Sequence, residues 1–122
     1  MFKKLFLTLL LTTLVPVFAG DYDDVSKSGD KVFLYLYSPD CGYCLKANPI
    51  YHKAAKIYDK KCKFVKTDIN SRDGRALAIT YKANYVPFAV LIDSKSKQAM
   101  QVPAPCLLSY ACTEQVMNEF TK

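Results

Sequence analysis

Two cysteines three positions apart are the residues of this sequence best placed to do chemistry. Cys41 and Cys44 lie in the stretch SPDCGYCLKANP, residues 38–49. A thiol pair at this spacing can hold a metal ion, cross-link the fold, or exchange electrons with other thiols and disulfides. The surrounding sequence decides between these three roles.

A structural zinc site needs two further ligands besides Cys41 and Cys44. The other cysteines and the sole histidine form no second closely spaced pair: Cys62, Cys106, Cys112 and His52. We therefore predict no metal site. Of the remaining roles, redox chemistry is favoured, and an inert cross-link stays open as the alternative.

The N-terminal residues have the pattern of a secretory signal peptide. Two lysines precede an apolar stretch, residues 5–18, and a small-residue cleavage pattern ends at Ala19. The stretch is shorter than the roughly 20 residues that a membrane-spanning helix needs. We expect residues 1–19 to be removed. The mature chain, residues 20–122, is then expected to be soluble and periplasmic or otherwise extracytoplasmic, where disulfides persist.

The mature chain is long enough for one domain with a single core. The full sequence has a formal net charge of +6, but its lysines are scattered rather than interleaved with stacking aromatic residues. This favours a solvated surface, and we predict no nucleic-acid partner.

Strand and helix patterns alternate along the chain. A continuous run of β-branched and aromatic residues, 31–37, is typical of a buried central strand. From Cys41 onward, apolar residues recur at the three- and four-residue steps of an amphipathic helix. The predicted buried positions of this helix are Ala47, Ile50, Tyr51, Ala54, Ile57 and Tyr58.

The rest of the chain continues the alternation. The pattern predicts a strand at 63–69, a helix capped at Asn70 or Ser71 and running to about Lys82, strands at 88–92 and up to Val102, and a helix near 116–120 that starts close to Ser109 or Thr113. The short polar turn between the last two strands makes them antiparallel. We predict an α/β fold with a central mixed β-sheet flanked by helices.

Over nearly all of residues 30–122, the chain resembles the thioredoxin-fold thiol-disulfide oxidoreductases, the thioredoxins and Dsb-type proteins. Cys41-Gly-Tyr-Cys44 follows the first central strand and opens a helix, Pro49 lies within that helix, and Val86-Pro87 precedes the third core strand. The resemblance implies a thioredoxin fold, disulfide exchange with protein thiols and disulfides, and no cofactor beyond the Cys41–Cys44 disulfide itself.

The expected roles follow from position in the helix. Cys41, in the first turn, meets unsatisfied backbone N–H groups that stabilise a thiolate, so we expect it to be the nucleophile. Cys44 is expected to resolve the mixed disulfide. Gly42 lets a substrate backbone approach, and Tyr43 adds an apolar contact.

Val86 and Pro87 are expected to bind substrate. Only about 5–6% of X-Pro bonds are cis, but the resemblance implies a cis bond before Pro87. The backbone of Val86 would then pair with an extended substrate segment.

Two departures from the family pattern bear on the direction of exchange. Tyr35 stands where thioredoxins carry a buried acid, and Asp40 stands where they carry tryptophan. The charge of Asp40 opposes the helix dipole beside Cys41, and Gly42-Tyr43 lacks the histidine of strong oxidases. We therefore predict a reductase or isomerase, served by a membrane redox partner, rather than a strong oxidase. Because the sequence shows no counterpart of the dimerisation domain of DsbC-type isomerases, we also expect a monomer.

The three other cysteines allow more than one pairing. The short separation of Cys106 and Cys112 favours a local disulfide, which leaves Cys62 unpaired, and a bridge from Cys62 to either one stays open. The alternative function is a thioredoxin-fold binding or assembly module whose Cys41–Cys44 pair is vestigial or structural.

Overall fold

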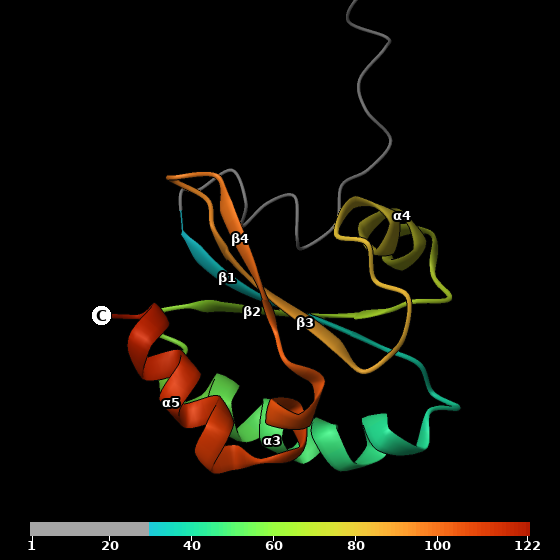
Figure 1. Cartoon of the computed structure of the whole chain (residues 1–122), viewed down its shortest axis with the longest axis horizontal. Helices are drawn as coiled ribbons and strands as arrows, with labels where there is room; N and C mark the ends of the chain where they lie inside the picture. The colour runs from blue at the N-terminus through green and yellow to red at the C-terminus, as the bar shows by residue number, and fades with distance from the viewer. Residues whose placement is uncertain (1–29) are drawn as a thin grey trace, which may run out of the picture.

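The structure is a computed structural model that describes residues 30–122 (Figure 1). The predicted signal peptide, residues 1–19, and the polar segment after it lie outside the described residues. None of the helices in the described part is both long and apolar enough to cross a lipid bilayer.

Strand β1 (Lys31–Tyr37) is central because its five interior residues are apolar or aromatic and are buried on both faces. It pairs in parallel with β2 (Lys63–Asp68) and antiparallel with β3 (Phe88–Asp93). Strand β4 (Gln98–Val102) pairs antiparallel with β3, so the order across the sheet is β2-β1-β3-β4. The predicted α/β fold with a central mixed sheet is confirmed.

Helices cover both faces of this sheet. Helices α3 (Gly42–Tyr58) and α5 (Tyr110–Phe120), with the 3-10 helix η1 (Ala104–Leu108), lie on one face, and α4 (Arg72–Thr80) lies on the other (Figure 1). Alternate side chains of β1 point to opposite faces. Phe33 and Tyr35 therefore belong to the core under α3, whereas Leu34 belongs to the core under α4.

Helix α3 buries most of the predicted stripe, namely Ala47, Tyr51, Ala54 and Tyr58. These four residues are three or four positions apart and form one line along the helix. The prediction for Ile57 was wrong, because its side chain lies off this line and is 55% exposed.

The ends of α4 and α5 are set by local hydrogen bonds. Ser71 caps α4, because its Oγ accepts a hydrogen bond from the Gly74 N–H at 3.0 Å. This helix ends at Thr80, short of the predicted Lys82, and Lys82 has a left-handed φ of 57°. Ser109, one of the two residues expected near the start of α5, caps that helix by accepting from the Cys112 N–H at 3.3 Å.

A disulfide joins Cys106 in η1 to Cys112 in the first turn of α5, with a Cα–Cα distance of 5.1 Å. Cys106 is buried in the core under α3. A bridge that closes so short a loop stabilises a fold by about 2 kcal/mol, mainly by restricting the unfolded chain. The bridge therefore fastens the last helix to the core.

Candidate active site

The turn after β1 places Cys41 at the N-cap of α3. The Cys41 N–H donates to the Ser38 carbonyl at 3.2 Å, and the extended backbone of Cys41 directs its side chain back over the first turn. The Cys41 Sγ there accepts a hydrogen bond from the Cys44 N–H at 3.0 Å. Free N–H groups and the positive end of the helix dipole favour negative charge at this position. The site is therefore suited to a thiolate.

A disulfide links Cys41 to Cys44, with 5.1 Å between their Cα atoms. Cys44 lies one turn into the helix and its exposed fraction is 0%, whereas Cys41 is half-buried. Only the sulfur of Cys41 is open to a partner thiol. The two residues thus differ in access as a nucleophile and a resolving cysteine must.

Val86 and Pro87 come from the loop before β3 and lie close to the cysteines at one end of the sheet, where β1 ends and β3 begins. The Val86–Pro87 peptide bond is cis, as the resemblance implied. The Cys41 Sγ lies 3.6 Å from the Val86 carbonyl oxygen. Val86 is half-buried and Pro87 is buried, so this loop presents backbone rather than a large side chain beside the disulfide.

Gly42 and Tyr43 form the exposed surface between the cysteines. No heavy atom lies within 4 Å of the place that a Cβ on Gly42 would take, so the space above it is open. Tyr43 is 62% exposed, and the Lys46 Nζ lies 5.7 Å from the centre of its ring. This surface has room for a substrate backbone.

Sequence reasoning did not identify two exposed apolar residues close to these positions in the chain, Leu45 and Tyr85. Leu45 follows Cys44, and Tyr85 precedes Val86. The Tyr85 hydroxyl accepts a hydrogen bond from the Gln101 Nε2 at 2.8 Å. The available signal in the sequence was an apolar residue next to Cys44 and another next to Val86. The sequence alone does not show that their side chains are exposed.

Asp40 and His52 both lie on the surface. Asp40 is exposed, and its backbone N–H donates to the Ser38 Oγ at 3.4 Å. His52 is also exposed, with its Nε2 3.4 Å from the Lys66 Nζ. Within residues 30–122, no three His, Cys, Asp or Glu side chains are grouped to hold a metal ion.

Cys62 lies apart from this site. Lys63 is aligned with Val32 at the start of β1, so Cys62 is at the end of the sheet opposite Cys41. It is a buried free thiol, and burial raises its pKa to about 12.

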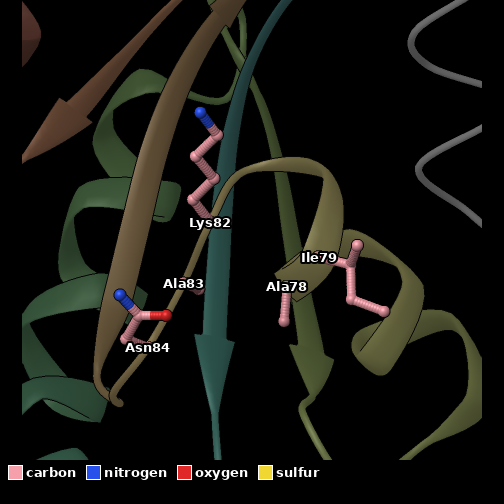
Figure 2. A pocket seen from close by; sticks show the side chains of 5 residues that line it. All are labelled: Ala78, Ile79, Lys82, Ala83 and Asn84. Carbon is pink, nitrogen blue, oxygen red and sulfur yellow. The ribbon is translucent and has the colours of Figure 1, made fainter.

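An open groove of about 410 Å³ lies beside α4. Figure 2 shows Ala78 and Ile79 on the helix and Lys82, Ala83 and Asn84 on the loop that follows it. This lining contains no thiol, carboxylate or imidazole. The Cys41–Cys44 pair, and not this groove, is therefore the candidate active site.

The family model of thioredoxin matches residues 16–105 of the chain. Protein disulfide-isomerase of Triticum aestivum is 27% identical over 90 residues, which cover 71% of this chain and 18% of that protein. Protein disulfide-isomerase A4 of Mus musculus is 42% identical over 41 residues, 34% of this chain and 6% of that protein. The chain spans less than a fifth of the length of these curated relatives.

Solved structures show the same architecture. A mutant thioredoxin from Halobacterium salinarum NRC-1 has a TM-score of 0.70 and 25% identity, with 84% of each chain covered. The first thioredoxin domain of mouse protein disulfide-isomerase A4 has a TM-score of 0.69 and 21% identity, covering 84% of this chain and 71% of that one. The second likeness concerns the fold alone.

Proposed function

This chain belongs to the thioredoxin family, and from that premise we propose that it exchanges disulfides with protein substrates through Cys41 and Cys44. One observation carries the proposal. The half-buried Cys41 sulfur, at the N-terminus of α3, forms a disulfide with the fully buried Cys44 sulfur. The Cys41 Sγ also lies 3.6 Å from the Val86 carbonyl oxygen.

The reducing direction takes two steps. The Cys41 thiolate attacks a substrate disulfide, one substrate sulfur leaves as a thiolate and takes a proton, and a mixed disulfide remains. The Cys44 thiolate then attacks the Cys41 Sγ and releases the second substrate sulfur. The substrate gains two electrons and the protein pair becomes the disulfide, while oxidation of a substrate runs through the same steps in reverse.

Substrate recognition uses backbone more than side chains. An extended segment that carries the target disulfide lies along the Val86 backbone and over the open space at Gly42, with Tyr43 as an apolar contact. This mode selects for extended, accessible chains and tolerates varied sequences. Unfolded or loosely folded proteins are the matching substrates.

The proposed direction is reduction or isomerisation, in an extracytoplasmic compartment. Asp40 adds a negative charge next to Cys41, and Gly42 and Tyr43 between the cysteines supply no positive charge. A pair of this kind needs a supply of electrons to stay reduced, and a membrane redox partner fills that role for a monomer outside the cytoplasm.

Insulin reduction tests the proposed function. With dithiothreitol as electron source, the purified protein is expected to accelerate the precipitation of the insulin B chain, measured as turbidity. Alkylation of the reduced protein with iodoacetamide before the assay supplies the control and should remove the acceleration. Insulin that precipitates no faster than with dithiothreitol alone would favour the binding or assembly module instead.

The charge of Asp40 gives a further prediction. Asp40→Asn is expected to lower the midpoint of the Cys41 thiolate titration, measured as the ultraviolet absorbance of the thiolate in the reduced protein. Because Asp40 is exposed to solvent, the shift should be small, roughly a few tenths of a pH unit. Asp59→Asn, at the far end of α3, is the matched control. An unchanged midpoint in Asp40→Asn would remove the electrostatic argument against a strong oxidase.

A further inference from the structure

The buried hydroxyl of Tyr35 lies next to the backbone of Cys44. Tyr35, in the middle of β1, is fully buried. Its hydroxyl donates to the Asn48 Oδ1 at 2.8 Å and lies 3.4 Å from the Cys44 carbonyl oxygen. A buried hydroxyl that loses its partner destabilises the fold, so this hydrogen bond is strongly favoured in the native state.

The two residues of α3 that Tyr35 reaches are one helical turn apart, and Pro49 follows them. Proline has no N–H, so the Leu45 carbonyl lacks the hydrogen bond that an ordinary residue 49 would donate. The first turns of α3 are thus tied less firmly to the rest of the helix. The Tyr35–Asn48 bond connects this segment to the central strand at the point where the helix's own bonding is interrupted.

The ring of Tyr35 is fixed as well as its hydroxyl. It stacks on Tyr51 with 4.8 Å between the ring centres and on Tyr37 with 6.2 Å. Burial raises the pKa of Tyr35 to about 12. The hydroxyl therefore stays neutral near pH 7, where it serves as a hydrogen-bond donor and not as a proton acceptor.

We infer that Tyr35 and Asn48 are positioning residues that hold Cys44 in place for attack on the mixed disulfide. The inference rests on the proposed function and assigns these two residues a part in its second step. In that step the Cys44 thiolate forms a bond to the Cys41 Sγ, the Cys41–substrate bond breaks, and the substrate sulfur leaves with the electron pair. Because Cys44 is kept in position, the effective concentration of its attacking sulfur near the Cys41 Sγ is raised.

Helix α3 offers a matched control at its other end. The Tyr58 hydroxyl donates to the Asn118 Oδ1 at 2.6 Å, so Tyr58→Phe removes a tyrosine–asparagine bond that is remote from the cysteines. Tyr35→Phe and Tyr58→Phe should both lower the melting temperature. Only Tyr35→Phe should alter the redox properties.

The test is equilibration of the full protein with glutathione. Relative to wild type, Tyr35→Phe is expected to shift the equilibrium toward the dithiol about fivefold, the equivalent of one ordinary hydrogen bond. The mixed disulfide with glutathione should persist about fivefold longer, as measured by acid quenching and mass spectrometry. Asn48→Leu should reproduce both changes, and the double variant should add little to either single variant.

The outcomes separate this inference from the proposed function. If wild type exchanges with glutathione and Tyr35→Phe stays within twofold of Tyr58→Phe in both readouts, the inference is wrong and the proposed function stands. If Tyr35→Phe does not fold, Asn48→Leu alone decides by the same criterion. If wild type does not exchange with glutathione, the proposed function itself fails.

Discussion

Cys44→Ser is expected to accumulate mixed disulfides with substrate proteins, because it leaves the accessible Cys41 intact and removes the thiol that would release the substrate. Cys44 is fully buried, so it cannot form the first bond with a bulky partner itself. The trapped species should appear on non-reducing gels as higher bands that dithiothreitol removes.

Cys41→Ser is the matched variant and should form no such bands. It removes the nucleophile altogether, so the rate of insulin reduction should fall by at least about 10³-fold. Each variant retains the other thiol of the pair, which controls for nonspecific trapping. Accumulation of mixed disulfides in Cys41→Ser but not in Cys44→Ser would reverse the two roles.

Gly74→Ala is expected to cause the largest loss of stability of any single methyl addition to a glycine in the described chain. A Cβ at Gly74 would lie 2.7 Å from the carbonyl carbon of Asp68 and 2.9 Å from the Cα of Ile69, and it would also collide with the Asp68 carbonyl oxygen. These are backbone atoms at the end of β2, so no side chain can turn aside. The free energy of unfolding should fall by about 3 kcal/mol.

Urea denaturation measures this change, and Gly42→Ala supplies the control. Nothing lies within 4 Å of a Cβ at Gly42, which is also the first residue of α3. Alanine there should leave stability unchanged or raise it by up to about 1 kcal/mol, since alanine favours helix. A Gly74→Ala protein as stable as wild type would show that the β2–α4 connection adjusts freely.

The sequence was sufficient for the features that depend on short-range pattern. The apolar run of β1, the helical spacing of Ala47, Tyr51 and Ala54, and the short turn before β4 each produced the predicted element. Ser71 and Ser109 could be expected as caps because a serine oxygen satisfies a free N–H at a helix start. Each of these features is determined by interactions between residues that are close together in the chain.

Other features depend on how the helices, strands and turns pack against one another. The hydrogen bond between Tyr35 and Asn48 depends on how α3 is positioned along β1. The periodicity of apolar residues does not determine that position. The close approach of Gly74 to Asp68 depends on how tightly the chain turns after β2. Ile57 looked like a core residue because apolar spacing alone does not say which side of the helix the neighbouring elements will cover.

The buried position of Cys62 matters for the proposed exchange of disulfides. At pH 7, a thiol with a pKa of about 12 has a thiolate fraction on the order of 10⁻⁵. Its side chain is also only 3% exposed. In the proposed cycle, each turnover creates a mixed disulfide that a reactive thiol could capture, but Cys62 is both inaccessible and protonated. Burial of Cys62 in the native fold would thus protect the proposed redox cycle from disulfide exchange with the protein's own unpaired cysteine.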